Sequence, residues 1–260
     1  VNAVVPDQDK FDCLYVYYLL KHNLNLVKQA DTGASSGREN VSKSNFSALT
    51  VWACLDLNTQ KQIAEVLDAF DSSIETNQRR IALLEDAARR IYREWFVHLR
   101  FPGHESVPVK DGVPEGWQLT SLDQALFLQR GFDLPNSTRI AGDVPVFAST
   151  GLNGFHNQAK VAGPGVVTVR SGTLGAVHYV SQDFWPLNTS LWVKEFRTAS
   201  PLLAYFILSE LHLEQFNSGA SVPTLDRKVV HQQPILIPPR SAITAFDVKV
   251  QPLFDEIDTL

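Results

Sequence analysis

Polar side chains suited to contacting DNA recur in the turns of residues 103–240. The segment Arg170–Gly175 places Arg170, Ser171 and Thr173 on a glycine-rich turn, through which a backbone can approach a phosphate closely. An arginine forks onto a phosphate or a guanine edge, and the two hydroxyls can donate hydrogen bonds. The segment therefore suggests a DNA-facing loop. A plain hairpin turn, with Arg170 paired to an acid, is the alternative that these residues favour when taken by themselves.

Three further loops carry the same residue types: two flank an expected strand near Val144, and the third spans residues 221–228 and also carries Thr224 and Lys228. Asparagine suits adenine and arginine suits guanine, but for any single residue a solvated loop is the simpler interpretation. Collectively we expect several to share one DNA-binding face. The candidate contacts are Arg130, Ser137, Thr138, Arg139, Ser149, Thr150, Asn153, His156, Arg170, Ser171, Thr173, Ser221 and Arg227.

Motifs for catalysis and for metal binding are missing from the sequence. It contains no Gly-x4-Gly-Lys-Ser/Thr phosphate loop, no Asn/Asp-Pro-Pro-Tyr/Phe segment and no Gly-x-Ser-x-Gly elbow. His98 and His104 lack further ligands at metal-binding spacing, and Cys13 and Cys54 are expected to be reduced. A small hydrolase would need a perturbed acid–base pair, of which the sequence gives no sign. We therefore expect neither a catalytic residue nor a metal site.

Composition limits the class of protein that must position these loops. With 260 residues, 44% hydrophobic and 20% charged, the chain has the composition of a globular protein. No apolar run reaches 18 residues and no signal segment opens the chain, so we expect a cytoplasmic protein with no membrane partner. A net charge of −5 gives no support to bulk binding of polyanions. If DNA is the ligand, either cations are locally clustered or partner subunits supply the contacts to phosphate.

The clearest expected element is one long helix over residues 58–102. It begins after Asn58–Thr59, and no glycine or proline interrupts it before Phe101–Gly103. Such a helix is about 60 Å long and needs a partner helix to bury its apolar stripe. Asn77, the one polar residue of the stripe, is either a tolerated edge residue or a register-setting one. Alternating steps of three and four predict the coiled-coil seam Ile63, Leu67, Phe70, Ile74, Asn77, Ile81, Leu84, Ala88, Ile91 and Trp95.

An internal repeat relates residues 14–70 to residues 203–254, about 185 positions later. Each copy has an apolar helix, then Thr32–Ser35 or Ser218–Ser221, then a short strand at Leu49–Trp52 or Pro234–Ile237, and finally the start of a long helix. Between the copies, residues 103–240 are expected to form one α/β globule. Its strands are expected at residues 144–147, 166–169, 176–180 and 190–193, and its helix after Ser200.

Several segments resemble the specificity subunits of type I restriction–modification enzymes. The runs Asn77–Glu85, Ala88–Val97 and Arg100–Glu105 resemble the central conserved region of that family. Pro114–Trp117 looks like the beginning of a target recognition domain, and Gly163–Val167, Arg170–Gly175 and Phe184–Thr189 resemble its core motifs.

This resemblance implies an α+β fold in which an α/β target recognition globule is attached to a long coiled-coil helix. The architecture is pseudo-repeated, with the first recognition domain and the second helix incomplete. Residues 1–57 correspond to the C-terminal remnant of a first recognition domain, 58–102 to the conserved helix, 103–240 to the second recognition domain and 241–260 to the start of a second conserved helix.

The same resemblance implies a function. Such a subunit reads half of a bipartite site on double-stranded DNA and is non-catalytic. Its expected partners are methylation subunits, expected to number two, which use S-adenosylmethionine, and restriction subunits, which use ATP and Mg²⁺; self-association through the helices is a further expectation. The alternative is a coiled-coil scaffold without DNA binding, which the acidic net charge slightly favours. Arg130, Arg139 and Arg170 on one face of the globule would favour the DNA reader over the scaffold.

Overall fold

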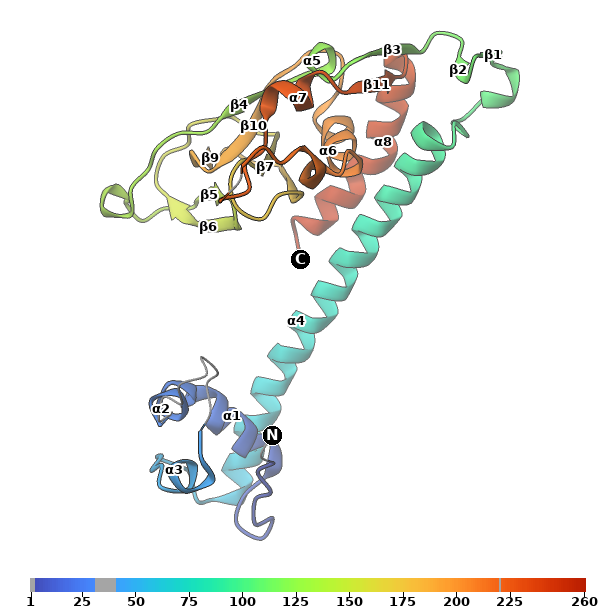
Figure 1. Ribbon diagram of the computed structural model, residues 1–260. Coiled ribbons are helices and arrows are strands. Elements are labelled where there is room, and N and C mark those ends of the chain that lie inside the picture. Colours follow the sequence, from blue (N-terminus) through green and yellow to red (C-terminus); the bar gives the residue numbers. More distant parts are fainter. Residues whose placement is uncertain (1–2, 31–40, 220) are drawn as a thin grey trace. The chain divides into compact units, whose positions relative to one another are not determined.

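The computed structural model describes residues 3–30, 41–219 and 221–260 (Figure 1). The chain forms two compact units, Val1–Arg80 and Ile81–Leu260. The division falls within one helix, α4 (Leu57–Tyr92), so each unit is described separately. No helix in the described part of the chain is both long and apolar enough to cross a membrane.

The first unit is helical and packs around the beginning of α4. It contains α1 (Cys13–His22), α2 (Leu24–Gln29) and α3 (Lys43–Ser47). The side chain of Asp12 caps α1 by accepting a hydrogen bond from Tyr15 N, and α1 then buries Tyr15 and Tyr18 against Ala64 of α4. The polar side chain of Gln60, also on α4, is fully buried beside this cluster.

The expected strand at Leu49–Trp52 is wrong. The residues have no regular secondary structure, and the Trp52 side chain is 98% exposed. Its counterpart in the second unit is a strand because it pairs with a neighbouring one, whereas no strand is present among the described residues of the first unit. The Thr32–Ser35 part of the proposed repeat lies outside the described residues.

Helix α4 is continuous for 36 residues and is followed by a π-helical turn, Arg93–Val97. The first half of the predicted seam is exposed at Ile63, Leu67, Phe70 and Ile74. Near the other end Ala88 is buried together with Tyr92 and Phe96, and the predicted Ile91 and Trp95 are partly buried and pack against the same core. The buried face at this end therefore includes the predicted positions and widens to take in Tyr92 and Phe96.

The second unit is built on a four-stranded antiparallel sheet with the strand order β4 (Leu126–Arg130), β10 (Ser190–Phe196), β7 (Gly165–Val169) and β8 (Val177–Val180). All five residues of β7 are buried, as expected of a central strand. Helix α6 (Pro201–Glu210) begins after its cap Ser200 and packs against β7 and β8, with α8 (Arg240–Ile257) beside it (Figure 1).

Smaller sheets and short helices complete the unit. The sheets are β6 (Gly151–His156), β5 (Val144–Ala148) and β9 (Trp185–Pro186) in that order; β11 (Pro234–Ile237) with β3 (Gln118–Ser121); and β1 (Val109–Lys110) with β2 (Val113–Pro114). The short helices are η2 (His104–Ser106), α5 (Leu122–Ala125), η3 (Asn136–Thr138), η4 (Leu213–Phe216) and α7 (Arg227–His231). Each strand expected from the sequence in residues 144–193 is present.

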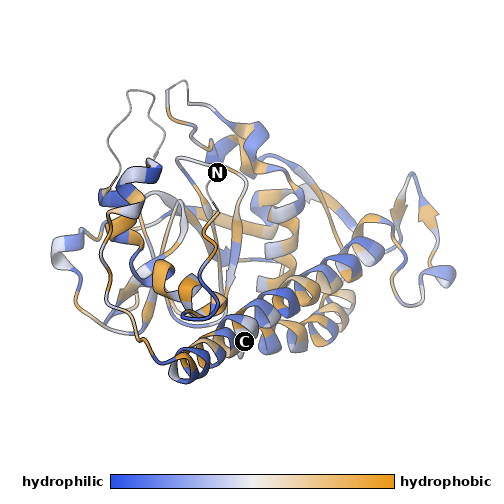
Figure 2. Cartoon of the chain, turned by 90° about the horizontal axis from the view of Figure 1, so that it is seen from below, coloured by the Kyte–Doolittle hydropathy of each residue, from blue (hydrophilic) through white to orange (hydrophobic). Residues whose placement is uncertain are grey.

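An aromatic cluster joins the end of α4 to the globule. The ring of Phe246, on α8, lies 4.9 Å from that of Phe96 and 5.7 Å from that of Phe206, and Tyr92 stacks on Phe206 at 5.2 Å. In the hydropathy-coloured view, hydrophobic and hydrophilic residues alternate along α4, as in an amphipathic helix (Figure 2). The helix and the mixed sheets confirm the α+β class.

Candidate nucleic-acid interface

Four cations from separate parts of the second unit surround one open cavity of about 420 Å³. They are Arg130 at the end of β4, Arg170 directly after β7, and Arg227 and Lys228 at the start of α7. Leu191, Leu225 and Asp226 complete the lining. The sequence placed these cations in different candidate loops, and the fold brings them together. We call Arg130, Arg170, Arg227 and Lys228 the cationic cluster.

Strand β10 and its neighbours explain this convergence. Arg130 pairs with Leu191 in the β4–β10 register, and Arg170 N donates to the carbonyl of Thr189, just before β10. Leu225 N donates in turn to the carbonyl of Arg170 across 2.8 Å. The ends of β4 and β7 are therefore tied to the same stretch of β10, and the segment leading into α7 is tied to Arg170.

The cationic cluster has no acidic counterpart in the described residues. Arg130 Nε and Arg170 Nη1 both donate to the backbone oxygen of Asn188, across 3.3 and 3.2 Å, and Arg227 Nη1 donates to the backbone oxygen of Leu128. Among these residues no carboxylate lies within ion-pair distance of any of the four. Asp226 lines the cavity, but its side chain caps α7 by accepting from Lys228 N. Neutral oxygens hold the guanidinium groups, and among the described residues none of these groups forms an ion pair.

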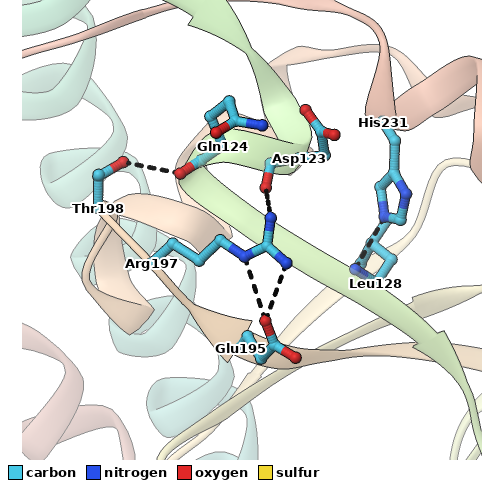
Figure 3. Close-up of polar contacts among 7 residues, drawn as sticks. All are labelled: Asp123, Gln124, Leu128, Glu195, Arg197, Thr198 and His231. Atoms are coloured by element: carbon cyan, nitrogen blue, oxygen red, sulfur yellow. Dashed lines mark hydrogen bonds and ion pairs between the residues drawn. The ribbon is translucent and has the colours of Figure 1, made fainter.

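A neighbouring arginine shows the ordinary arrangement. Arg197 is paired with Glu195 through two nitrogens, at 3.1 and 3.0 Å, and donates to the carbonyl oxygen of Asp123 (Figure 3). The guanidinium carbons of Arg197 and Arg227 lie 5.4 and 5.7 Å from the ring centre of Phe127, within the range of cation–π attraction. Arg197 is thus neutralised by an acid, whereas Arg227 is held only by a ring and a carbonyl.

The two hydroxyl-bearing loops meet beside the cationic cluster. Ser171 forms an isolated antiparallel bridge with Thr224, and Gly172 N donates to the carbonyl of Pro223. Thr173 is exposed and lines a neighbouring open cavity of about 500 Å³, and Ser221 is exposed on the opposing loop. Ser149 adjoins them, because a Cβ on Gly172 would lie 3.6 Å from that of Ser149.

A second group of candidates gathers at the β5–β6 hairpin. Arg139 donates through Nη1 to the carbonyl oxygen of Asn153 and through Nη2 to its amide oxygen, across 2.7 and 3.0 Å. Ser137 and Thr138, in η3, are exposed, as is Thr150 at the tip of the hairpin. The two bonds of Arg139 fasten the end of η3 to the hairpin. We call Ser137, Thr138, Arg139, Thr150 and Asn153 the hairpin group. Arg139 belongs to this group and not to the cationic cluster, so only part of the arginine trio expected on one face shares a site.

His156 has a different position from the one expected of a DNA contact. Its side chain is buried, at 4% exposure, and its Nδ1 accepts a hydrogen bond from Ile140 N. Its ring also packs edge-on against Trp185. His156 therefore stabilises the hairpin from within and is not at the surface.

Two contributors have no signal in the sequence motifs. The carbonyl of Asn188 orients two arginines, and a backbone oxygen has no side-chain signature. Lys160 is exposed, and its Nζ lies 5.6 and 5.5 Å from the ring centres of Phe132 and Trp185. The sequence does carry a signal for the Asp226 cap, because an acid directly before a short basic segment is typical of a helix start.

The side chains that could bind a metal ion are not grouped in the described part of the chain. Within the described residues, no group of three or more histidine, cysteine or carboxylate side chains could hold a metal ion. The shape and charge of the cationic cluster are those of a site for anions.

Comparison with known proteins extends these observations. Residues 1–86 match the family model described as the type I restriction modification DNA specificity domain. The specificity subunit of the type I restriction enzyme MjaIX, from Methanocaldococcus jannaschii, is 22% identical over 94% of this chain and 62% of its own length. The MjaVIII specificity subunit of the same organism is 30% identical over 46% of this chain and 28% of its own length. These matches confirm the resemblance stated from the sequence.

A solved structure shares the fold. The crystal structure of the type I restriction–modification S subunit from M. genitalium superposes with a TM-score of 0.55, covers 97% of this chain and 70% of that one, and is 16% identical. The chain spans 62% of the length of the MjaIX relative and 28% of the MjaVIII relative.

Proposed function

We propose that this chain, as a relative of the type I restriction–modification specificity subunits, is a DNA sequence-recognition subunit that reads one half of a bipartite site. The observation that carries the proposal is the convergence of Arg130, Arg170 and Arg227 on one cavity, where none of the three forms an ion pair within the described part of the chain. Local clustering of cations is one way in which a protein of net charge −5 can bind a polyanion. A scaffold with no DNA role gives no reason for such a cluster.

In this proposal the long helix has a mechanical role. Helix α4 sets the spacing between this recognition globule and a second one. Its exposed apolar residues Ile63, Leu67, Phe70 and Ile74 supply a surface for a partner helix, in another subunit or another copy of the chain. The helix also offers charged faces to methylation subunits.

The chemistry belongs to the partners in this proposal. Methylation subunits, two per complex, would bind S-adenosylmethionine and modify an adenine, and restriction subunits would use ATP and Mg²⁺. The chain itself would be non-catalytic and would act in the cytoplasm of a bacterium or an archaeon. Domain limits at 1–57, 58–102, 103–240 and 241–260 remain predictions within this scheme.

Methylation sequencing of the genome tests the proposal. Strains with and without this gene, each carrying the methylation subunit, are compared. We expect a split motif whose two halves are separated by a fixed gap, methylated only when the gene is present. A scaffold without DNA recognition would leave the methylated motifs identical in both strains, and that result would reject the function.

A further inference from the structure

We infer that the cationic cluster binds a backbone phosphate of DNA and reads no base, so that choice of sequence lies with other residues, foremost the hairpin group. This inference rests on the proposed function and assigns the cluster its ligand class. Its first ground is the shared acceptor. Two guanidinium groups at one neutral carbonyl oxygen repel each other, and the Asp226 carboxylate of the cavity lining forms no ion pair with either, so a bound anion would relieve the repulsion.

The second ground is shape. Base edges lie at the floor of a major groove about 8.5 Å deep, so a side chain must protrude to reach them. The cationic cluster instead lines a recess, with Leu191 and Leu225 among its walls. Arg170 and Arg227 are half-buried, and each has already committed one donor to a backbone oxygen. Phosphates project from the outside of the duplex and can enter such a recess.

The third ground is rigidity. Arg130 and Arg170 are fixed at the ends of β4 and β7, and Arg227 is held at the start of α7 by Leu128 and the Phe127 ring. The three arginines thus line one recess from three elements and keep donors that these bonds do not use, as a tetrahedral group with several oxygens requires. Ser137, Thr138 and Thr150, by contrast, are exposed at η3 and at a hairpin tip, where they can extend into a groove.

The two modes of contact predict different responses to salt. Each phosphate contact contributes roughly 0.9 to the slope of log K against log salt, whatever the sequence. Losing a phosphate contact therefore weakens binding to every duplex alike and reduces the slope by about one. Losing a base contact weakens only the recognised duplex and relaxes the motif at one position.

The test uses the chain assembled with its methylation subunit. Binding to a duplex carrying the methylated motif and to a scrambled duplex is measured from about 50 to 200 mM salt. We expect Arg170→Gln and Arg227→Gln to weaken both duplexes about tenfold, to lower the slope by about one each and to leave the motif unchanged. Lys228→Gln removes an exposed cation that makes no side-chain contact needed for folding, and its slope should fall in the same way.

Arg240→Gln, at the start of α8 and away from the cavity, is the matched control with the same change in charge, and it should keep the wild-type slope. A wild-type assembly that binds neither duplex would reject both the proposed function and this inference. Normal wild-type binding, combined with variants that keep the full slope or alter one position of the motif, would overturn the phosphate assignment while leaving the function intact.

Discussion

The Nε2 atom of buried His231 accepts a hydrogen bond from the backbone N–H of Leu128 across 2.9 Å (Figure 3). This bond fastens α7 to β4, and with it Arg227 to the side of the cavity where Arg130 lies. An acceptor nitrogen must be unprotonated, so the bond requires a neutral ring at Nε2. Burial lowers the pKa of His231, Arg227 lowers it further, and Asp123 opposes them.

Stability should consequently fall in mild acid. In the unfolded chain the imidazole takes up a proton below about pH 6.5, while the folded state resists protonation to a lower pH. The unfolded state thus binds more protons, and the free energy of unfolding declines as the pH falls from about 6.5 towards the lowered pKa. Thermal unfolding between pH 5 and 8 measures this decline.

His231→Gln tests the source of the decline, because the amide oxygen can still accept from Leu128 N but does not titrate. We expect the free energy of unfolding of this variant to decline less steeply as the pH falls. Part of the remaining decline comes from His178, because burial lowers the pKa of that side chain as well. His22→Gln, at an exposed position of the first unit, is the control that should keep the wild-type acid limb. Identical acid limbs for wild type and His231→Gln would contradict the assignment.

Phe246 links α8 to the end of α4, and its loss should be costly. The side chain is fully buried and contacts the rings of Tyr92, Trp95, Phe96 and Phe206. Phe246→Ala should lower the free energy of unfolding by about 3–5 kcal/mol, measured by denaturant titration. Val248→Ala, on the same helix but 71% exposed, should change it by less than about 0.5 kcal/mol. Equal effects would show that this face of α8 is not packed as described.

The sequence was sufficient for the long helix and the central strands because their signals are local. An uninterrupted amphipathic pattern predicted residues 58–102, and helix α4 with its π-helical turn covers 57–97. Which residues it buries depends on the elements that pack against it. The heptad pattern pointed to Ile91 and Trp95, which are partly buried. Tyr92 and Phe96, which pack against rings of α6 and α8, are the more deeply buried residues.

The sequence also identified the polar residue types in the loops, but it did not predict which loops the fold brings together. The cationic cluster exists because β10 lies between β4 and β7 in the sheet, although it follows both in the chain. Strand order of this kind is a long-range property, and no local pattern separates Arg170, beside the cavity, from Arg139, which bonds to the hairpin. His156 was misjudged for the same reason, since a polar side chain in a loop gives no sign that it points inward.

Gln60 shows how a buried polar side chain can escape a sequence pattern. Its place directly after Asn58–Thr59 suggested an ordinary helix start. The side chain is fully buried: its Oε1 accepts from Asp12 N, and its Nε2 donates to the carbonyl oxygens of Lys10 and Cys54. Gln60→Leu leaves three backbone groups without a partner and should destabilise the first unit by roughly 2–4 kcal/mol. Gln62→Leu, at an exposed position two residues later, is the control and should be nearly neutral. Hydrogen exchange of α1 amides reports on this unit directly, and equal protection in both variants would refute the role of Gln60.

Phe70 is the most exposed of the four apolar residues on the first half of the seam, at 66%. The first unit packs α1 on a different face of α4, at Gln60, Ala64 and Asp71, so α1 does not cover this stripe. Burial of one such ring in a helix pair is worth about 1.5–3 kcal/mol, and a charge placed there opposes pairing. Phe70→Asp should therefore weaken helix-mediated assembly, with itself or with the methylation subunit, by at least tenfold in sedimentation or light scattering. Ser72→Asp adds the same charge on nearly the opposite face of α4 and should leave assembly unchanged. If the two variants form assemblies of the same mass across the concentration range, the seam is not an interface.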